Sequence, residues 1–302
     1  MKILITEKIN QKGLEMIEQS GFTVINAYGN EEIINKNISE VEGIVVRTFP
    51  LNSNLLKKAK KLKIISKHGV GIDNIDTEYC SNNGIVITKT PGANSLSVAE
   101  HAFSMMISLS KNLKHISKEY VANGFEAKNN IIGFEMSNKT LGIIGLGSIG
   151  QNLLKLTKGF NMKVLAFDPY LKNKVDGVKI VEEIEELIVS SDFISIHCAL
   201  TDSTRNLINY EKLKKMKKNA ILVNCARGGI INENDLIKAI NENLIYGAGL
   251  DVTEKEPLEK DDELFNHDNI IITPHSAVST KEASENVAII AATNIINYFK
   301  EE

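Results

Sequence analysis

Three polar side chains follow largely apolar runs in the second half of the chain, and their types suit proton transfer and the binding of an acid. Arg227, Glu256 and His275 each stand just beyond a predicted strand. A histidine takes a hydroxyl proton near neutral pH, a carboxylate orients its ring, and an arginine binds a carboxylate through two hydrogen bonds. Each residue alone also suits a plainer role, as a sheet-edge ion pair, a solvated loop residue or a helix cap. Because open α/β sheets build their sites where strands end, their joint position predicts one site.

A glycine-rich turn lies between an apolar run and a helix-like segment. Gly145, Gly147 and Gly150 have the spacing G-x-G-x-x-G, with a predicted strand at 140–144 before them and a predicted helix at 149–159 after them. In that context the backbone N–H groups face the pyrophosphate of a dinucleotide. A glycine turn in some other strand–helix–strand unit is the alternative, and the flanking elements favour the dinucleotide.

An acid follows the next predicted strand, residues 163–167. Asp168 stands 18 residues after the last glycine, close to the roughly 20 typical of a carboxylate that binds the adenosine ribose. Such a carboxylate repels a 2′-phosphate, and the next residues, Pro169 and Tyr170, include no arginine to receive one. The sequence therefore predicts NAD rather than NADP as the cofactor.

Together the two groups of residues predict hydride transfer from a hydroxyl-bearing carbon. The hydroxyl proton must leave as the hydride passes to the nicotinamide, and His275 is the candidate acceptor for that proton. Glu256 would orient the imidazole and favour its protonated form, while Arg227 would bind a carboxylate of the substrate.

Short β-rich runs alternate with helix-like patterns along the whole chain, which predicts an α/β fold with parallel sheets covered by helices. We expect two doubly wound domains, a Rossmann NAD-binding domain and a smaller flavodoxin-like substrate domain. The predicted strands lie at 2–6, 23–26, 43–47, 63–66 and 85–88 in the first half and begin at Thr140, Lys163, Phe193, Ile221, Gly247 and Ile270 in the second.

The chain of 302 residues has room for two domains of ordinary size. We expect the substrate domain at 1–96 plus 280–302 and the dinucleotide-binding domain at 97–279. A long helical pattern from Asn94 toward His115 would link them. A last helical pattern, at 280–300, would pack back on the N-terminal half and make the substrate domain discontinuous.

Composition narrows the class of protein further. The net charge of −3 gives no basic field for nucleic acid, and the lysine-rich stretches 57–63 and 212–218 are interleaved with apolar residues, as in solvated helix faces. Three widely spaced cysteines predict neither a disulfide framework nor a metal site, which fits a reducing, cytoplasmic setting. No stretch approaches 18 uninterrupted apolar residues, so no membrane partner is expected.

Four segments, in this order along the chain, resemble the D-isomer-specific 2-hydroxyacid dehydrogenase family. They are Gly-Leu-Gly-Ser-Ile-Gly at 145–150, Asn-Cys-Ala-Arg-Gly-Gly at 224–229, residues 251–257 and Thr-Pro-His at 273–275. Within that family the chain is most similar to short D-3-phosphoglycerate dehydrogenases that lack C-terminal regulatory domains, through residues 71–76, 90–97 and 279–283. The resemblance covers nearly the whole chain, and it implies the catalytic roles given above to Arg227, Glu256 and His275.

The resemblance also implies the rest of the site. Backbone amides at Val70 and Gly71 would hold the substrate carboxylate, and Arg47 and Lys67 would bind a substrate phosphate. Ser148 stands where relatives often carry arginine, which would weaken one pyrophosphate contact. The implied cofactor contacts are Gly145, Gly147, Ser148, Ile149, Gly150, Asp168, Cys198, Cys225, Asp251 and Ala277.

The implied reaction is the NAD-dependent oxidation of D-3-phosphoglycerate to 3-phosphohydroxypyruvate, the first step of serine biosynthesis, by a homodimer formed through the dinucleotide-binding domain. A reductase of glyoxylate, hydroxypyruvate or another 2-keto acid is the nearest alternative, with the same three catalytic residues. An NAD(H)-sensing co-regulator without enzymatic activity is the alternative from another class, although such a protein needs no acid/base pair.

Overall fold

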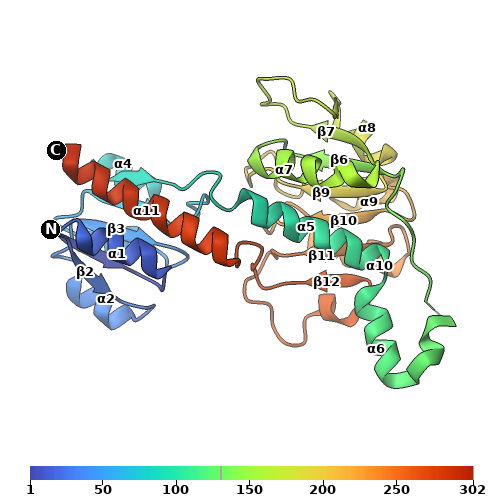
Figure 1. Cartoon of the computed structure of the whole chain (residues 1–302), viewed down its shortest axis with the longest axis horizontal. Coiled ribbons are helices and arrows are strands. Elements are labelled where there is room, and N and C mark those ends of the chain that lie inside the picture. Colours follow the sequence, from blue (N-terminus) through green and yellow to red (C-terminus); the bar gives the residue numbers. More distant parts are fainter. Residues whose placement is uncertain (130, 302) are drawn as a thin grey trace. The chain divides into compact units, whose positions relative to one another are not determined.

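The structure is a computed structural model that describes residues 1–129 and 131–301, and the chain divides into two compact units. Unit 1 comprises Met1–Asn94 and Val278–Glu302, and unit 2 comprises Ser95–Ala277. Figure 1 shows that each unit is built around its own sheet. The roles expected for the two domains, substrate binding and dinucleotide binding, stay predictions.

Unit 1 contains a sheet of five strands, all parallel, in the order β2-β1-β3-β4-β5. This is the flavodoxin-like doubly wound order, so the α/β class and the five expected strands are confirmed. The strands are β1 (Lys2–Ile5), β2 (Thr23–Asn26), β3 (Gly43–Val46), β4 (Ile64–Lys67) and β5 (Val86–Thr88).

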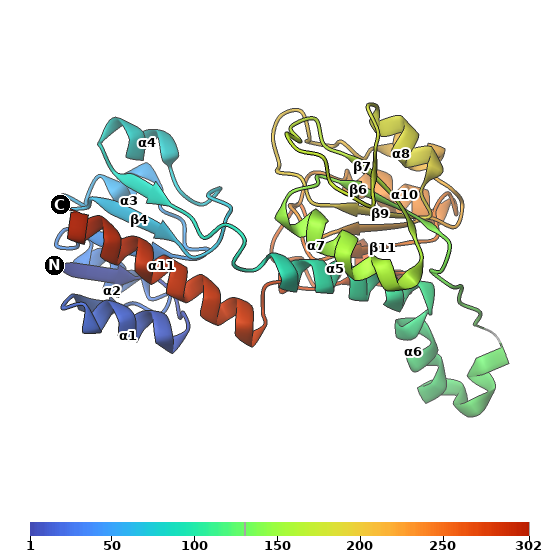
Figure 2. The ribbon, with the colours of Figure 1, turned by 45° about the horizontal axis from the view of Figure 1, so that its top comes forward.

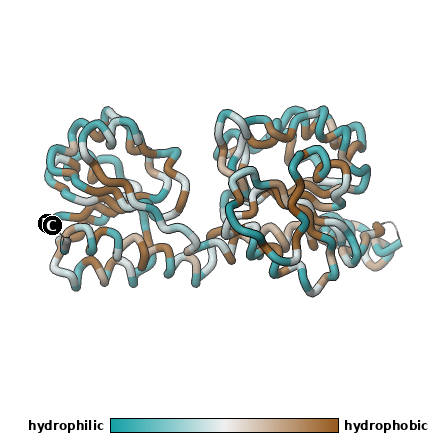
Figure 3. The backbone as a smooth tube through the Cα atoms, turned by 90° about the horizontal axis from the view of Figure 1, so that it is seen from above, coloured by the Kyte–Doolittle hydropathy of each residue, from teal (hydrophilic) through white to brown (hydrophobic). Residues whose placement is uncertain are grey.

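Helices cover both faces of this sheet because successive strand residues point to opposite sides. Ile3 and Ile5 of β1 pack in one apolar cluster with residues of α1 and α11, whereas Leu4 packs in the other with residues of α2 and α3. In Figure 3 the hydrophobic stretches run along the strands inside each unit. The helices are α1 (Gln11–Gln19), α2 (Glu31–Asn37), α3 (Ser53–Leu56), α4 (Thr77–Asn82) and α11 (Lys281–Glu301).

Unit 2 contains a parallel sheet of seven strands in the order β12-β11-β10-β9-β6-β7-β8. The chain reverses its direction of travel along the sheet between β6 and β9, the Rossmann arrangement in which ligands bind at the carboxyl ends of the strands. The six expected strands are present, and the short β8 was not foreseen. The strands are β6 (Thr140–Ile144), β7 (Lys163–Phe167), β8 (Lys179–Ile180), β9 (Phe193–Ile196), β10 (Ile221–Asn224), β11 (Gly247–Leu250) and β12 (Ile270–Ile272).

The helices of unit 2 also lie on both faces of its sheet, with α5 and α7 on one side and α8, α9 and α10 on the other (Figure 2). The long helix expected to run toward His115 is broken at Asn112, whose φ of 53° ends the helical path before α6. In the described part of the chain, no helix is long and apolar enough to cross a membrane. The helices are α5 (Ser95–Ser110), α6 (Leu113–Asn123), η1 (Gly124–Asn129), α7 (Ser148–Thr157), η2 (Lys158–Phe160), α8 (Ile184–Ser190), α9 (Tyr210–Lys215), α10 (Glu233–Asn241) and η3 (Glu263–Asn266).

Candidate active site

The glycine turn of unit 2 lies between β6 and α7, and its three glycines meet different surroundings. Gly145 has a φ of +91°, and a Cβ there would lie 2.7 Å from the backbone N of Cys198. A Cβ on Gly150 would lie 2.5 Å from the Gly145 carbonyl oxygen, so the helix can approach the strand only without a side chain. Gly147 has no atom within 4 Å of its Cβ position. A tight turn, an open backbone and a close helix are the features that a pyrophosphate requires here.

Asp168 follows β7 and lies beside this turn. One of its carboxylate oxygens accepts a hydrogen bond from the backbone N–H of Leu146 at 2.8 Å, and the other accepts from Tyr170 N–H at 2.9 Å. The parallel register pairs Ile144 with Phe167, which brings the acid to the glycine turn. A half-buried carboxylate in this position fits a ribose with two free hydroxyls and opposes a phosphate, so the turn and Asp168 together suit NAD.

His275 and Glu256 form a pair at the carboxyl ends of β12 and β11. The Nδ1 of His275 lies 2.9 Å from Oε2 of Glu256, and the two side chains are 43% and 40% exposed. Because a carboxylate only accepts, Nδ1 carries the proton and donates it, which leaves the lone pair on Nε2. The exposed Nε2 is then able to take a proton from a bound hydroxyl.

Backbone and side-chain bonds from Asp251 hold the segment that carries His275. The φ of His275 is 50°, in the left-handed region, where a histidine is held at a cost of about 1 kcal/mol. Its N–H donates to the Asp251 carbonyl at 2.8 Å, while the buried Asp251 carboxylate accepts from the N–H groups of Ser276 and Ala277 at 2.8 and 3.0 Å. The hydroxyl of Thr273 donates to the same carboxylate at 2.6 Å. Asp251 therefore fixes the segment from within the protein.

Arg227 follows β10, the neighbour of β11, and a buried asparagine shapes its turn. The Asn224 side chain donates to the Arg227 carbonyl at 2.9 Å and accepts from Ala226 N–H at 3.0 Å. Nη1 of the half-buried Arg227 donates to the Ala226 carbonyl at 2.7 Å. The sequence analysis gave Asn224 no role, although an asparagine at the end of an apolar strand is a signal for such a turn.

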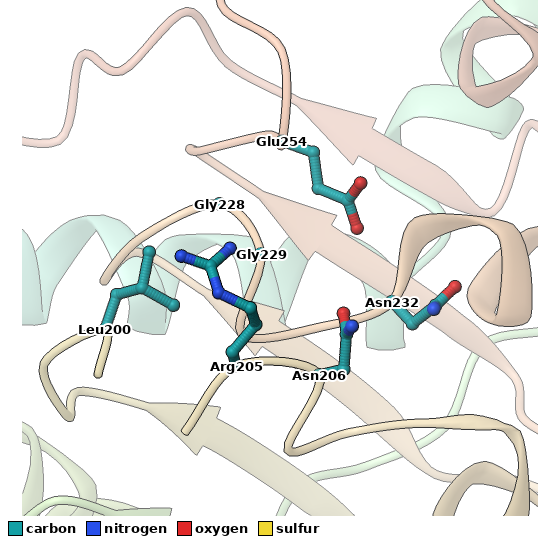
Figure 4. A pocket seen from close by; sticks show the side chains of 7 residues that line it. All are labelled: Leu200, Arg205, Asn206, Gly228, Gly229, Asn232 and Glu254. Carbon is teal, nitrogen blue, oxygen red and sulfur yellow. The ribbon is translucent and has the colours of Figure 1, made fainter. Parts of the chain in front are cut away.

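The Arg227 turn and the Glu256 loop touch through Gly228. A Cβ on Gly228 would lie 1.9 Å from the Thr253 carbonyl oxygen, so only glycine permits this contact. Gly228 also lines a pocket of about 310 Å³, with Arg205 and Glu254 among the residues that face it (Figure 4). Neither Arg227 nor His275 lines this pocket. It is lined by Leu200, Arg205, Asn206, Gly228, Gly229, Asn232 and Glu254.

Two cysteines expected beside the cofactor lie at the ends of β9 and β10. Burial raises the pKa of the Cys198 thiol to about 11. Burial also raises the pKa of Cys225, which is 7% exposed. Both thiols stay protonated near neutral pH and so lack nucleophilic character.

The groups expected on unit 1 lie at the carboxyl ends of β3 and β4. Val70 is 45% exposed, and in the described residues no hydrogen bond is donated by the N–H of Val70 or of Gly71. The preceding Gly69, with a φ of +138°, is fixed by Thr90, whose hydroxyl accepts from Gly69 N–H at 3.1 Å. The two amides are therefore available to a ligand on an anchored loop, as the binding of an acid requires.

The loop that carries Arg47 is anchored by a carboxylate beneath it. Glu7 accepts hydrogen bonds from the N–H groups of Arg47, Thr48 and Phe49 at 2.9, 2.6 and 2.8 Å. Burial opposes ionisation of Glu7, but the hydrogen bonds from Thr6, Arg47 and Thr48 outweigh it and hold the pKa of this carboxyl below its usual value. The loop thus stabilises the ionised form of the carboxylate that holds it.

Lys67, which is expected to bind a substrate phosphate, is buried and bonded within unit 1. It is 7% exposed, and its ammonium group donates to the Arg47 carbonyl and, at 2.6 Å, to the side chain of Asn74. Asn74 in turn donates to the Phe49 carbonyl at 2.7 Å. Lys67 therefore holds the backbone of the Arg47 loop from inside, and this geometry disfavours it as a phosphate ligand.

Comparison with known proteins places this geometry in a family. A sequence model of the D-isomer-specific 2-hydroxyacid dehydrogenase NAD-binding domain matches residues 103–277. The chain is 40% identical to a D-3-phosphoglycerate dehydrogenase of Methanocaldococcus jannaschii, with 98% of this chain and 57% of that protein covered. It is 37% identical to a glyoxylate reductase of Thermococcus litoralis, with 100% and 94% covered. The chain belongs to the D-isomer-specific 2-hydroxyacid dehydrogenase family.

Solved structures agree with this assignment. The NAD⁺-bound 3-phosphoglycerate dehydrogenase of Entamoeba histolytica superposes with a TM-score of 0.84 at 30% identity, over 99% of this chain and 95% of that one. The D-lactate dehydrogenase of Aquifex aeolicus, complexed with NAD and lactic acid, gives 0.87 at 29% identity, over 100% and 96%. The predicted cofactor, NAD, is confirmed. The chain spans little more than half the length of the phosphoglycerate dehydrogenases that it matches among curated proteins.

Proposed function

We propose that the protein is an NAD-dependent D-2-hydroxyacid dehydrogenase that oxidises D-3-phosphoglycerate to 3-phosphohydroxypyruvate, the first step of serine biosynthesis. The His275–Glu256 pair carries the proposal, since its 2.9 Å contact leaves a histidine nitrogen ready to accept a proton. Arg227 follows β10, Glu256 follows β11 and His275 follows β12, and these three strands are consecutive neighbours in the sheet. The three residues therefore lie at the carboxyl edge of the sheet that bears the glycine turn. A protein that only sensed NAD(H) would need the turn but not this pair.

The proposed reaction removes a proton and a hydride from one carbinol group. Arg227 binds the substrate carboxylate through the hydrogen-bond donors of its guanidinium group. His275 takes the hydroxyl proton at Nε2, while Glu256 holds Nδ1–H and stabilises the resulting imidazolium. NAD, when bound, supplies the acceptor for the hydride, and the products are the 2-keto acid, the reduced cofactor and one proton. The glycine turn and Asp168 are the residues that would hold NAD.

A phosphorylated substrate is supported by two observations. The relative at 40% identity is named a D-3-phosphoglycerate dehydrogenase, and Arg47 lies on an anchored loop at the carboxyl edge of unit 1. Glyoxylate reduction is the second candidate, because the glyoxylate reductase relative is matched over 94% of its own length. The two candidates share every proposed catalytic residue and differ in the need for a phosphate-binding group.

Steady-state kinetics on a substrate panel tests the proposal. D-3-phosphoglycerate and D-glycerate are assayed with NAD⁺ and NADP⁺, and 3-phosphohydroxypyruvate, hydroxypyruvate and glyoxylate with NADH and NADPH. We expect the highest kcat/KM with the phosphorylated pair and the non-phosphorylated cofactor. A higher kcat/KM for glyoxylate would replace the first candidate by the second. NAD binding by titration without turnover of any acid would instead favour a sensor.

We also propose a cytoplasmic homodimer that forms through unit 2. Helix α6 has no buried residue, and Tyr120, Val121 and nearby Phe125 are 61%, 86% and 70% exposed. Such an apolar surface on an ordered helix favours cover by a second copy of this chain. Light scattering after size exclusion tests this, with Val121→Glu expected to yield monomers and Lys36→Glu, on unit 1, expected to leave the dimer. A monomeric wild type would refute the dimer.

A further inference from the structure

A pocket on unit 1 brings together two cations from adjacent strands of its sheet. We propose that Lys8 is a second phosphate-binding cation beside Arg47, and that Lys8 adds to the selection of phosphorylated over unphosphorylated hydroxy acids. The inference rests on the proposed function and names the residue that would replace Lys67 as the second cation. Lys8 follows β1 and Arg47 follows β3, and these strands are neighbours in the sheet.

The pocket has a volume of about 390 Å³ and room for a phosphoryl group. Lys8 is exposed, and within the described residues its ammonium group makes no hydrogen bond or ion pair. Nη1 of Arg47 donates to the Lys8 carbonyl at 3.0 Å, so the backbone of one cation orients the side chain of the other. The lining residues are Lys8, Ile9, Asn10, Gln11, Arg47 and Ser284.

The Arg47 side of the pocket is organised before any ligand binds. Glu7 holds the N–H groups of residues 47–49, while Lys67 and Asn74 hold the carbonyls of Arg47 and Phe49. A loop fixed on both sides loses little conformational freedom on binding, which favours affinity. Two acids adjoin lining residues in the sequence, Glu7 and Glu285. The Glu7 carboxylate accepts hydrogen bonds from four donors of this loop and from Thr6, and Glu285 forms an ion pair with Lys12.

The spacing along the sheet edge matches a three-carbon phosphorylated acid. The amides of Val70 and Gly71 follow β4, which lies next to β3. Neighbouring strands are about 4.8 Å apart, and the carboxylate and phosphate of such an acid are separated by about 5 Å by ordinary bond lengths. An acid bound by those amides at β4 would therefore extend its phosphate toward β3 and β1, where the two cations lie. A two-carbon keto acid would stop short of the pocket.

The charges of the pocket favour a phosphoryl dianion over a neutral hydroxyl group. Lys8 and Arg47 both carry a positive charge and hydrogen-bond donors that a phosphate accepts from, and Arg47 has a planar fork that fits two phosphate oxygens. D-Glycerate and hydroxypyruvate place only a hydroxyl group at this distance from the carboxylate. The two cations thus discriminate by charge rather than by size.

The test compares variants of the full chain by the ratio of kcat/KM for a phosphorylated substrate to kcat/KM for an unphosphorylated one. For wild type, Lys8→Gln, Arg47→Gln, Lys67→Gln and the exposed control Lys36→Gln, kcat/KM is measured for 3-phosphohydroxypyruvate and for hydroxypyruvate. We expect the preference for the phosphorylated acid to fall about 10-fold in Lys8→Gln and further in Arg47→Gln, through KM. In Lys67→Gln both substrates should suffer alike, with a lower melting temperature. An unchanged preference in folded Lys8→Gln, or a loss of preference specific to Lys67→Gln, would overturn the subsite.

A second readout separates the subsite from the proposed substrate. If the wild type reduces glyoxylate and not 3-phosphohydroxypyruvate, the proposed substrate is wrong, and inorganic phosphate then serves as the probe. Inhibition of glyoxylate reduction by phosphate that weakens about 10-fold in Lys8→Gln, but not in Lys36→Gln, would support the anion subsite. Equal inhibition of both variants, or none of the wild type, would refute it.

Discussion

Both units present groups at the carboxyl edge of a parallel sheet, but they hold those groups in different ways. In unit 2 the groups depend on special backbone geometry, because His275 sits at a left-handed turn held by the buried Asp251 and Gly228 lies against the Thr253 carbonyl. In unit 1 the loop that carries Arg47 has ordinary backbone geometry at that residue, and two charged side chains, the half-buried Glu7 and the buried Lys67, are bonded to the loop. Backbone positioning tolerates few substitutions, whereas side-chain positioning depends on which charges are ionised.

The two units also shift glutamate pKa values in opposite directions. Hydrogen bonds lower the pKa of Glu7 in unit 1 against the effect of burial. In unit 2, burial raises the pKa of Glu233 to about 7, with Glu254, Asp262 and Glu256 adding to the rise and the bond from Glu254 N–H opposing it. Ionisation of Glu7 thus stabilises the fold of unit 1, whereas ionisation of Glu233 destabilises the fold of unit 2.

The largest expected effect is on the chemistry assigned to unit 2. His275→Gln should lower kcat by about 10³-fold, because the hydroxyl proton loses its acceptor, while NAD binding by fluorescence titration stays near the wild-type value. His115→Gln is the matched control on α6, where the ring pairs with Asp268. Turnover within tenfold of wild type in folded His275→Gln would remove His275 from the mechanism, and with it the contrast between the units.

Glycine substitutions compare backbone with side-chain packing. Gly228→Ala should lower the free energy of unfolding by about 3 kcal/mol, since the new Cβ meets a carbonyl group that cannot move. Gly43→Ala in unit 1 should cost about 1 kcal/mol, because its Cβ meets the tip of the Ile3 side chain at 2.8 Å, which can shift. Urea denaturation followed by circular dichroism measures both, with Gly159→Ala, which has open space, as the control. Equal costs would contradict the distinction.

Glu7→Gln tests the charged support in unit 1. The folded carboxyl has a lowered pKa, so its contribution is present above the unfolded value near 4.5 and is lost as pH falls through the folded value. We expect a loss of about 1 kcal/mol at pH 7 after allowance for solvent screening, shrinking as the pH is lowered below 4.5. Thermal melts from pH 7 to pH 3 measure it, against the exposed Glu15→Gln. A difference that stays constant with pH would argue against a charge effect.

The smallest effect, and the one of opposite sign, belongs to Glu233. It exchanges hydrogen bonds with Glu254, whose N–H donates to it at 2.5 Å and whose carboxylate accepts from Glu233 N–H at 3.2 Å. With a raised folded pKa, its contribution is fully present below pH 4.5 and is lost as pH rises through about 7. We compare the free energy of unfolding of Glu233→Gln with that of the wild type. This difference should favour the variant more at pH 8 than at pH 5, by less than about 1 kcal/mol. The control is Glu211→Gln. A variant that gains more free energy of unfolding at pH 5 than at pH 8 would contradict a raised pKa for Glu233.

Much of the fold could be predicted because parallel strands leave a strong pattern. Buried strands such as residues 221–224 are short apolar runs, and the chain alternates between them and helices, so eleven of the strands follow from the sequence. β8 escaped because it has two exposed residues, Lys179 and Ile180, with no apolar pattern. The break at Asn112 escaped because a left-handed residue leaves the helical periodicity on both sides unchanged.

The candidate site could be predicted where function follows strand position. Glu256 and His275 meet because their strands are neighbours, which a doubly wound order implies. The direction of a flexible side chain has no such rule, so the sequence did not show that Lys67 is bonded inside unit 1, and it did not single out Lys8. Both lie next to a strand end, and only the position of Asn74 and of the Arg47 carbonyl draws Lys67 inward.

The left-handed backbone of His275 has a consequence for how this position would change under selection. Asparagine and glycine adopt that conformation at lower cost than histidine. The protein therefore has, at this position, a residue that makes the fold less stable than asparagine or glycine would. A library at position 275 selected only for heat resistance should drift toward asparagine or glycine, and one selected for growth that depends on the enzyme's activity should return to histidine. The conformation of one residue thereby separates what the fold prefers from what the reaction requires.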